Sequence, residues 1–442
     1  MTAYHAKRLP THKGPAAWSA ILPGRPPATP LAGDITADLV VIGAGFAGLS
    51  AARRALQIDP GLDVVILEAG RVAEGAAGRN SGFMIDLPHD LSSSDYAGSG
   101  DDAARIALNR RAIGFAQAAA EEYAIPRDFI DPAGKVNGAA SARGHAHNES
   151  YARHLAGLGE PCEMLDAQAM QDLTGSAHYR SGLYTPGTVM LQPAGYVRGL
   201  ARGLSSDAQL YEQSPVTGFA RLGNDWHVST PRGSVTTPLI ILGTNGHLES
   251  FGIASGRLMH IFLYASMTPE LPEGAVDGAA RWGITPADPM GTTMRRIDAG
   301  QGGNRIITRT CASFKPGMVA SDAALARAAR VHGEKFGNRF PALRGMEMAY
   351  SWAGHLCLSR NGVSVAGEVE EGVYAACCQN GLGTARGTMT GIGAAEMALG
   401  VESDITRALR FEAEPTRLPP RPFSDLGANA YLRWKEWRAG AE

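Results

Sequence analysis

Apolar residues gather in short runs along this chain, and near both ends such a run is followed at once by glycines. Residues 39–42 (Leu-Val-Val-Ile) and 64–67 (Val-Val-Ile-Leu) are continuous apolar runs with the length of a buried strand. Between them, glycines lead into a helical run that begins near Phe46. The pattern predicts a strand–helix–strand unit from Asp38 to Glu68, and such units build parallel sheets.

The rest of the chain mixes helical and strand periodicities. Helical spacing of apolar positions predicts helices at 101–125, 151–158, 166–173, 194–204, 321–336 and 388–399. Alternating or continuous apolar runs predict strands or extended segments at 183–191, 216–235, 239–242, 258–267, 292–297, 305–310 and 373–378. The expected fold class is therefore α/β, or α+β overall, with a strand-rich middle. Residues 1–33 are rich in proline and are expected to be irregular, either disordered or lying across the surface.

The first glycine segment has the spacing of a dinucleotide-binding fingerprint. Gly43, Gly45 and Gly48 form GxGxxG at the strand-to-helix turn, and Glu68 closes the second strand about twenty residues later. Gly43 allows the tight turn, Gly45 leaves room for a pyrophosphate, and Gly48 lets the helix pack closely on the sheet. The helix N-terminus attracts phosphates, and Glu68 accepts hydrogen bonds from ribose hydroxyls. The segment predicts a site for an ADP-containing dinucleotide, with FAD and NAD as alternatives.

Composition narrows the class of protein. The 442 residues suffice for two interleaved domains, and 44% hydrophobic with 19% charged residues is typical of a globular enzyme. A formal net charge of -2 speaks against a nucleic-acid partner. The five cysteines are scattered without a CxxC, so neither a disulfide framework nor a metal site is expected. Residues 1–30 lack the apolar core of a signal peptide, and no stretch has the length of a membrane span, so we expect a cytoplasmic protein.

Two further segments favour a flavin over a nicotinamide. Residues 373–387 repeat the order strand, glycine turn and helix, although GLGTARG lacks the fingerprint spacing. A helix N-terminus there would stabilise negative charge on a reduced flavin ring, and an ordinary glycine turn is the alternative. Residues 75–82 (GAAGRNSG) have little bulk, which lets the backbone thread beside a ring system. Arg79 is a candidate for a phosphate contact and Asn80 and Ser81 for hydrogen bonds to the flavin, with a flexible loop as the alternative.

With these segments in view, the chain resembles the D-amino-acid-oxidase-like FAD-dependent oxidoreductases. This group includes glycine oxidase, sarcosine oxidase and γ-glutamylputrescine oxidase, and the chain is most similar to the last. The segments that carry the resemblance are residues 38–48 with Glu68, 75–82, 350–354 (Tyr-Ser-Trp-Ala-Gly), 373–383 with the helix that follows, and the proline-rich, then aromatic, residues 411–437.

The resemblance implies an FAD cofactor held by a Rossmann-like domain, with an interleaved mixed-sheet domain for the substrate. The expected division is an N-terminal extension (1–33), a discontinuous FAD-binding domain (34–95, 150–250 and 350–410), a substrate-binding domain (96–149 and 251–349) and a C-terminal extension (411–442). The expected cofactor-binding residues are Gly43, Gly45, Phe46, Ala47, Gly48, Glu68, Ala69, Arg71, Ala77, Gly78, Arg79, Asn80, Ser81, Gly82, Val216, Gly243, Gly354, Gly381, Leu382, Gly383 and Thr384.

The implied reaction is oxidation of a C–N bond in a small amine or amino acid, by hydride transfer to flavin N5 and then hydrolysis of the imine. Sarcosine oxidases tether the flavin through a cysteine near the tryptophan segment. Gly354 and His355 stand at that place here, and Cys357 is out of register, so non-covalent FAD is expected. Oxidases of the group often use a lysine to activate oxygen, and the nearest one, Lys315, is not clearly in register. The acceptor is therefore left open between O2, which is favoured, and a quinone or carrier protein.

The candidates for substrate chemistry are Arg296, His260 and His355. An arginine suits a bidentate clamp on a carboxylate, and Arg296 is preferred to Arg295 and Arg309, with solvated arginines as the alternative. The histidines are interpreted as catalytic, with a structural histidine or a flavin neighbour as the other reading. A clamp favours an amino acid or an N-substituted glycine such as sarcosine or iminodiacetate over a polyamine; a γ-glutamylated amine is a further candidate. An NAD-linked dehydrogenase and a flavin-binding protein without turnover are the rival functions.

The end of the chain combines basic and aromatic residues. Residues 431–438 read Tyr-Leu-Arg-Trp-Lys-Glu-Trp-Arg and are predicted to be helical. We expect this helix to dock on the protein's own surface, with contact to a membrane surface as the alternative.

Overall fold

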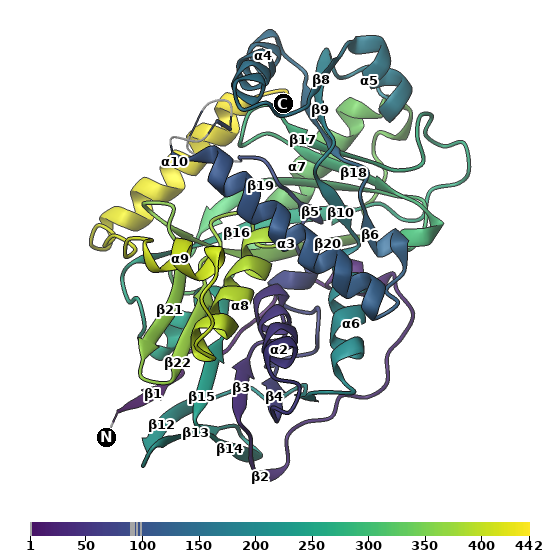
Figure 1. Cartoon of the computed structure of the whole chain (residues 1–442). Coiled ribbons are helices and arrows are strands. Elements are labelled where there is room, and N and C mark those ends of the chain that lie inside the picture. The colour runs from purple at the N-terminus through teal and green to yellow at the C-terminus, as the bar shows by residue number, and fades with distance from the viewer. Residues whose placement is uncertain (1, 89–92, 94–95, 98–99) are drawn as a thin grey trace.

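The structure, a computed structural model, describes residues 2–88, 93, 96–97 and 100–442 (Figure 1). Its helices are α1 (Ala17–Ala20), α2 (Phe46–Ile58), α3 (Asp102–Glu122), α4 (Ala142–Gly157), α5 (Ala167–Thr174), α6 (Pro193–Leu204), α7 (Asp322–Arg339), α8 (Ala385–Ala398), α9 (Asp404–Arg410) and α10 (Phe423–Ala439). Its strands are β1 (Ala3–His5), β2 (Gly33–Thr36), β3 (Leu39–Ile42), β4 (Val64–Leu67), β5 (Phe83–Met84), β6 (Ile130–Asp131), β7 (Lys135–Ala139), β8 (Glu163–Leu165), β9 (Ser181–Thr185), β10 (Val189–Leu191), β11 (Gln209–Tyr211), β12 (Gly218–Leu222), β13 (Asp225–Ser229), β14 (Gly233–Thr237), β15 (Leu239–Leu242), β16 (Leu258–Met267), β17 (Trp282–Pro286), β18 (Thr293–Ile297), β19 (Arg305–Phe314), β20 (Tyr350–Ser359), β21 (Val365–Glu370) and β22 (Val373–Cys377). No helix in the described part of the chain is both long and apolar enough to cross a membrane.

A six-stranded sheet in the order β11-β4-β3-β15-β22-β21 holds the N-terminal strand–helix–strand unit. Its neighbours pair in parallel, except that β21 runs antiparallel to β22. The central strands are apolar on both faces because both faces are covered. Helices α2, α6 and α8 pack on one face, and the five-stranded sheet β1-β12-β13-β14-β2 packs on the other.

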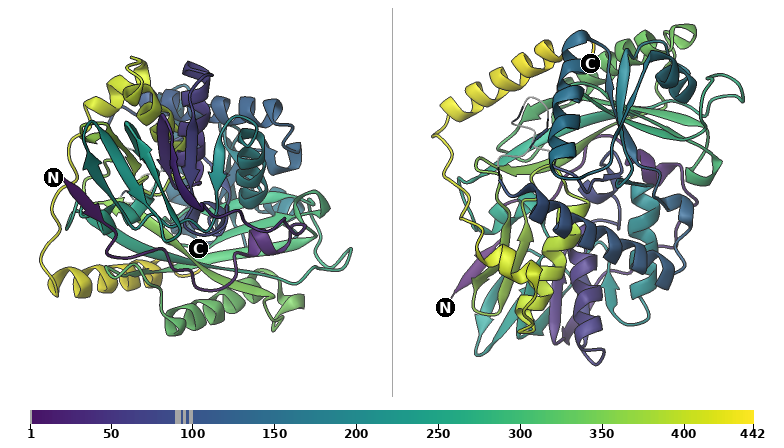
Figure 2. Two further views of the ribbon diagram at one scale, coloured as in Figure 1. Left: turned by 90° about the horizontal axis from the view of Figure 1, so that it is seen from below. Right: turned by 45° about the horizontal axis from the view of Figure 1, so that its top comes forward.

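An eight-stranded sheet in the order β20-β16-β19-β18-β17-β7-β9-β8 lies above the six-stranded sheet in Figure 1. Helix α7 packs on its outer side, where Phe336 and Phe340 join the buried cluster around Trp282. The long helix α3 connects the two parts, because Ala112 packs with the α6 and α8 core whereas Ile106 packs with Leu183 of β9. Figure 2 shows the two parts stacked in both further views. The short sheet β5-β10-β6 completes the described strands.

Most of the predicted elements are confirmed, and the fold is the predicted mixture of α/β and mixed-sheet parts. Residues 2–33 of the proline-rich extension lie across the protein: β1 pairs with β12, and Trp18 of α1 is completely buried. Helix α4 begins at Ala142, earlier than predicted, because Ser141 caps it by accepting from the Gly144 N–H. Strand β17 was not predicted, because its sequence Trp-Gly-Ile-Thr-Pro contains a glycine and a proline, which are both unfavourable within a strand.

The division into domains stays a proposal. The eight-stranded sheet draws β7 and β16–β19 from the ranges predicted for substrate binding, but β8, β9 and β20 from the ranges predicted for FAD binding. Helix α3, predicted for the substrate part, packs on α6 and α8. The boundary predicted at residues 95 and 96 falls partly outside the described residues.

Candidate functional site

A cavity of about 330 Å³ lies between the six-stranded and the eight-stranded sheet. Its lining includes the carboxyl ends of β3 and β4, residues 75–77 and 79–83, the turn before α8, and parts of β16, β19 and β20. Ligands bind at the carboxyl ends of strands in open parallel sheets, so the cavity is where a nucleotide is expected. Residues 8–12 of the N-terminal extension form a further wall, which the sequence pattern did not indicate.

The three fingerprint glycines have the roles that their spacing predicts. Gly43 has φ +104°, and a Cβ there would lie 2.8 Å from the carbonyl oxygen of Gly243 on the neighbouring strand turn. A Cβ on Gly48 would collide with the Gly43 carbonyl oxygen, so this glycine sets how closely α2 approaches β3. A Cβ on Gly45 would meet only Ala77, at 3.6 Å, because this position faces the cavity. The first turn of α2 therefore opens its N–H groups toward the cavity.

Glu68 and Asn245 supply polar atoms at the carboxyl ends of β4 and β15. Glu68 accepts hydrogen bonds from the Ala44 N–H at 2.9 Å and from the Gly70 N–H at 3.0 Å. Burial raises the pKa of the Glu68 carboxyl, against the effect of these two hydrogen bonds. Asn245 lines the cavity, and its Oδ1 is buried with no hydrogen-bond partner among the described residues. An open glycine turn, an acid at the strand end and an unsatisfied buried acceptor fit the ADP half of a dinucleotide.

Residues 75–82 wrap the cavity, but two of their side chains act within the protein. The Arg79 guanidinium donates to the carbonyl oxygens of Glu74, Lys13, Gly14 and Ala353. The Asn80 side chain donates to the Ala77 carbonyl oxygen at 2.6 Å and accepts from the Gly82 N–H at 2.8 Å. The Arg79 guanidinium ties residues 75–82 to the N-terminal extension and to β20, and its predicted phosphate contact stays a prediction.

The turn before α8 brings a second helix N-terminus to the cavity. Gly381, Leu382, Gly383 and Thr384 all line it, directly before α8 begins at Ala385. The Thr384 hydroxyl donates to the Phe83 carbonyl oxygen at 2.8 Å, which fixes the turn against β5. The positive end of α8 therefore faces this part of the cavity, as the glycine-rich sequence predicts.

One row of residues crosses the eight-stranded sheet and lines the cavity. Ala265 of β16 pairs with Trp352 of β20 and with Arg309 of β19, and Arg309 pairs with Thr293 of β18. Thr285 of β17 also lines the cavity. The Trp352 indole N–H donates to the Arg79 carbonyl oxygen at 3.0 Å, so this end of the row is fixed to residues 75–82.

Arg309 is the cation of this row. Its guanidinium makes one weak hydrogen bond, to the Thr293 hydroxyl at 3.4 Å, and no carboxylate among the described residues pairs with it. Burial lowers the pKa of Arg309. An arginine next to a cavity without an acidic partner is suited to binding an anionic group of a ligand.

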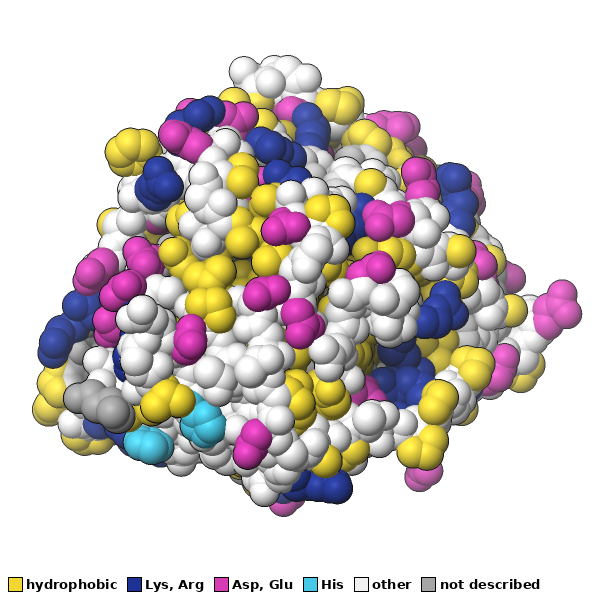
Figure 3. Space-filling model, turned by 60° about the horizontal axis from the view of Figure 1, so that its bottom comes forward, with side chains coloured by type: hydrophobic (Ala, Val, Ile, Leu, Met, Phe, Trp, Pro, Cys, Tyr) yellow, Lys and Arg dark blue, Asp and Glu magenta, His cyan; other side chains and the backbone are white. Residues whose placement is uncertain are grey.

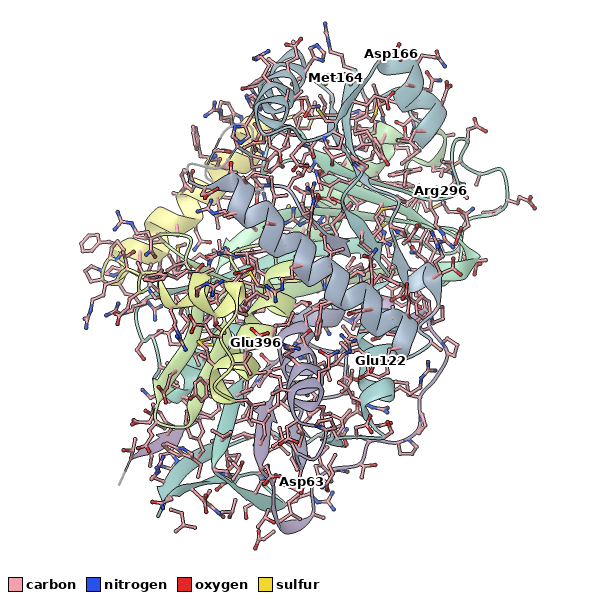
Figure 4. The ribbon with its side chains drawn as sticks, viewed as in Figure 1. Asp63, Glu122, Met164, Asp166, Arg296 and Glu396 are labelled. Atoms are coloured by element: carbon pink, nitrogen blue, oxygen red, sulfur yellow. The ribbon has the colours of Figure 1, made fainter. Side chains whose placement is uncertain are left out.

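Arg295 and Arg296 lie elsewhere, on opposite sides of β18 as strand alternation requires. Arg295 is buried and donates to the carbonyl oxygens of Ser81, Gly82 and Leu191, so it supports the cavity wall from outside. Arg296 donates to Asn304 Oδ1 at 3.2 Å and to the Asp277 carbonyl oxygen at 2.8 Å. Figure 4 shows Arg296 on the flank of the molecule. Arg296 does not line the cavity, so the structure does not bring the preferred clamp residue to the site.

A buried lysine lies directly behind the row. Lys135 Nζ donates to the Thr285 hydroxyl at 3.2 Å and also to Asn137 Oδ1. Burial lowers the pKa of Lys135 to about 8. Lys315, the lysine singled out from the sequence, does not line the cavity. Lys135, and not Lys315, is therefore the lysine at this end of the cavity, and no sequence pattern had indicated it.

His260 and His355 lie together with one acidic residue, Glu249. His260 Nε2 donates to Glu249 Oε2 at 2.5 Å, because an ionised carboxylate only accepts, and His260 Nδ1 lies 3.2 Å from His355 Nε2. His355 lines the cavity and stacks on Phe262 with ring centroids 5.0 Å apart. Burial and the neighbouring His247 and His260 hold the pKa of His355 well below its usual range, so this imidazole is neutral at physiological pH.

This histidine cluster is distant from Arg309. His355 pairs with Phe262, three residues along β16 from the Ala265 that pairs with Arg309, and β20 is two strands away from β19. Strand rise and strand spacing then separate the two backbones by about 14 Å. A small molecule held by Arg309 does not span that distance, so the two groups serve different parts of the cavity.

Nearly all of the predicted cofactor-binding residues come together at this cavity. Those that line it are Gly43, Gly45, Phe46, Ala47, Glu68, Ala69, Ala77, Arg79, Asn80, Ser81, Gly82, Val216, Gly243, Gly354, Gly381, Leu382, Gly383 and Thr384. Those that do not are Gly48 and Gly78, which allow close backbone packing, and Arg71, which pairs with Glu212 at 3.5 Å. Their roles toward a ligand stay predictions.

Several cavity residues were missed from the sequence: residues 8–12, Asn245, His247, Thr285 and Thr293. Asn245 had a signal, because it stands just after a predicted buried strand and its glycine. Thr285 and Thr293 are placed by pairing between distant strands, and residues 8–12 by the path of the N-terminal extension, which no local pattern encodes. Cys357 is fully buried and does not line the cavity, whereas His355 does, and non-covalent FAD stays the prediction.

Comparison with known proteins places the chain among flavoenzymes. A family model described as FAD dependent oxidoreductase matches residues 38–397. The chain is 26% identical over 426 residues to "Probable oxidoreductase OrdL" of Rhizobium meliloti, covering 92% of this chain and 94% of that protein. It is 29% identical over 223 residues to gamma-glutamylputrescine oxidoreductase of Escherichia coli, covering 48% of this chain and 50% of that protein. The solved structure of glycine oxidase from Geobacillus kaustophilus superposes with a TM-score of 0.67 at 16% identity, covering 83% of this chain and 96% of that one.

Proposed function

The chain belongs to the FAD dependent oxidoreductase family, and on that premise we propose that it oxidises the C–N bond of a small amine that carries a carboxylate. The predictions of an oxidoreductase and of FAD are confirmed at the family level, and the NAD-linked alternative is dropped. When bound, FAD accepts the electrons that leave the substrate carbon. An amino acid, an N-substituted glycine or a γ-glutamylated amine would each meet this description, and the last class appears in the name of one relative.

The observation that carries the proposal is the position of Arg309. Its guanidinium faces the same cavity as the fingerprint glycines and has no acidic partner among the described residues. A carboxylate of the substrate would supply that partner through two parallel hydrogen bonds and would orient the neighbouring carbon. Thr293, already 3.4 Å from the guanidinium, would support the same geometry.

The amine must lose its proton before the C–N bond is oxidised. A low-dielectric wall disfavours the ammonium form, in the same direction as burial lowers the pKa of the Lys135 ammonium in this part of the protein. The wall includes Phe83, Ile85 and Leu382, which form one apolar cluster with Met190. We propose that burial of the substrate amine against this cluster supplies the neutral form without a dedicated base.

His260 and His355 were predicted to be catalytic, and that role stays a prediction. His260 is buried and does not line the cavity, whereas His355 does, and its distance from Arg309 favours contact with the cofactor over contact with the substrate. Gly354, the residue beside His355, approaches residues 75–82 so closely that a Cβ would lie 3.3 Å from the Arg79 carbonyl oxygen. We propose that neutral His355, held by His260 and Glu249, packs against the flavin rather than moving a proton at the reacting carbon.

The test of the proposal is Arg309→Met, assayed with a carboxylate-bearing amine and with the same amine as its uncharged amide. Loss of a charge-assisted bidentate contact of about 1.5–3 kcal/mol would raise KM for the carboxylate substrate by about 10- to 100-fold. KM for the amide should change little, because the amide makes no ion pair.

Arg296→Met is the matched control, because it also removes a buried arginine of this sheet but one that does not line the cavity. It is expected to lower stability and to leave the ratio of the two KM values unchanged. Equal effects of Arg309→Met on both substrates would contradict the carboxylate clamp.

The electron acceptor is proposed to be O2, with a quinone or carrier protein as the second candidate. The buried lysine at this end of the cavity favours O2, because a cation near the site stabilises superoxide-like negative charge. Reduced enzyme exposed to air should regain its colour within the turnover time if O2 is the acceptor. Recolouring only on addition of a soluble quinone would favour the dehydrogenase.

A further inference from the structure

The C-terminal helix α10 carries large hydrophobic side chains on its outward side. Phe423, Leu426, Trp434 and Trp437 are 72%, 70%, 45% and 79% exposed, and Tyr431 is 51% exposed. The first four follow at spacings of three, eight and three residues, which return to one side of an α-helix. Together the five expose on the order of 600 Å² of mostly apolar surface, as much as the largest patch on a typical monomer.

The opposite side of α10 is fixed to the protein. Asn429 Oδ1 accepts from the Phe314 N–H at 3.0 Å, and Glu436 Oε1 accepts from the Ala312 N–H at 2.7 Å. These backbone groups are free because β18 pairs with β19 only as far as Arg309. Leu432 packs in the cluster that contains Phe314. The prediction that this helix docks on the protein itself is therefore correct for one side, and the anchoring leaves the aromatic side facing outward.

The charge around this outward side differs from that of the whole chain. Five basic residues (Arg417, Arg421, Arg433, Lys435 and Arg438) and two acidic residues give residues 417–438 a net charge of +3, in a chain of -2. Both acids are paired, Asp425 with Arg421 at 2.7 Å and Glu436 with Arg327 at 2.8 Å and Arg433 at 2.9 Å, which leaves Arg417, Lys435 and Arg438 without an ion pair among the described residues. The face in Figure 3, in contrast, mixes acidic and basic side chains without a continuous patch of either sign.

The cations lie beside the aromatic rings. Lys435 Nζ is 5.7 Å from the ring centroid of Tyr431, and Arg438 Cζ is 5.4 Å from that of Trp434. Aromatic and aliphatic side chains with arginine and lysine around them are the composition of helices that lie in the interface of a bilayer. In such interfacial helices the aromatic rings enter the headgroup region, and the basic side chains contact anionic lipid.

We propose that α10 docks this protein on an anionic lipid surface, with the helix axis in the plane of the bilayer. A second copy of the chain fits the same surface less well, because an isologous contact would bring two faces of net positive charge together. The proposal does not depend on the substrate, since it rests on a surface apart from the cavity.

The test uses the FAD-loaded protein and vesicles of phosphatidylcholine alone or mixed with phosphatidylglycerol, in a sedimentation assay at low and high salt. The protein should sediment with the mixed vesicles at low salt, bind phosphatidylcholine weakly, and lose binding as salt screens the charges. The double variant Leu426→Ser with Trp437→Ser should weaken binding to the mixed vesicles at least about tenfold.

Leu222→Ser is the control, because Leu222 is 54% exposed on β12 in the part of the molecule away from α10. It should bind as the unchanged protein does. The proposal is overturned if mixed vesicles do not bind the protein, or if the double variant binds them equally well. It is also overturned if size measurement shows a dimer that the double variant abolishes, since the face would then be a contact between copies.

Discussion

Two cations, Arg309 and the buried Lys135, lie at one end of the cavity. Arg309 lines it, and Lys135 lies one hydrogen bond behind Thr285. Burial lowers the pKa of both side chains, that of Lys135 to about 8. Below that pH both residues are cationic and favour an anionic ligand, whereas above it only Arg309 keeps its charge.

This difference predicts a pH dependence of ligand affinity. A simple carboxylate without an amine group should bind more weakly as the pH rises through about 8, by about three- to tenfold, because Lys135 loses its proton. The perturbation of the flavin absorption spectrum on titration gives the dissociation constant at each pH. In Lys135→Met the affinity should be lower at pH 7 and constant across this range. A Lys135→Met protein that keeps the pH dependence would show that another group causes it.

The three arginines show how far a sequence predicts a site. Because side chains alternate along a strand, the sequence correctly predicts that Arg295 and Arg296 lie on opposite faces of the sheet. It does not tell which arginine faces the ligand, because that depends on how β18, β19 and β16 are paired. The pairing of β16 with β19 shifts at a bulge: Leu263 pairs with Ala312 and Tyr264 with Thr310, so Cys311, with φ +64°, has no partner on β16. No local sequence pattern indicates this shift.

At the scale of elements, the close approach of α2 to β3 holds the nucleotide end of the cavity. The carbonyl oxygen of Gly43 occupies the place where a Gly48 side chain would lie. Since both atoms belong to backbone, neither moves aside cheaply. The same elements also had the clearest sequence signals, because glycines, apolar runs and helix caps act within a few residues of each other.

The variant Gly48→Ala should therefore lose FAD and stability together. We expect destabilisation of about 1–3 kcal/mol from overpacking, seen as a lower Tm and a lower ratio of flavin to protein absorbance. Gly114→Ala is the matched control, since Gly114 is also inside a helix, α3, and a Cβ there meets nothing within 4 Å. Helix propensity alone makes that change neutral or stabilising. If both variants retained FAD equally, the close packing at Gly48 would not be what holds the site.

At the scale of the whole molecule, the cavity exists because segments from the N-terminal part and from the second half of the chain meet between two sheets. The N-terminal extension, the loop at residues 75–82, the strands β16–β20 and the turn before α8 each contribute a wall. The fingerprint turn and Glu68 lie within one short stretch of sequence, so a local pattern indicated them, whereas Asn245, which lines the same cavity, was missed. The end of the cavity proposed for the substrate is assembled from strands far apart in the sequence, since β7 (Lys135–Ala139) lies in one sheet with β19 (Arg305–Phe314), so its residues could not be ranked in advance.

The most direct test of the account is reduction of the bound flavin without oxygen. The purified protein is mixed anaerobically with amino acids, sarcosine, iminodiacetate, γ-glutamylated amines and polyamines, and its visible absorption is followed. Carboxylate-bearing amines should bleach the flavin, whereas polyamines and amides of the active compounds should bleach it slowly or not at all. Bleaching by polyamines alone would contradict the role of Arg309, and a flavin that no amine reduces would contradict the proposed reaction itself.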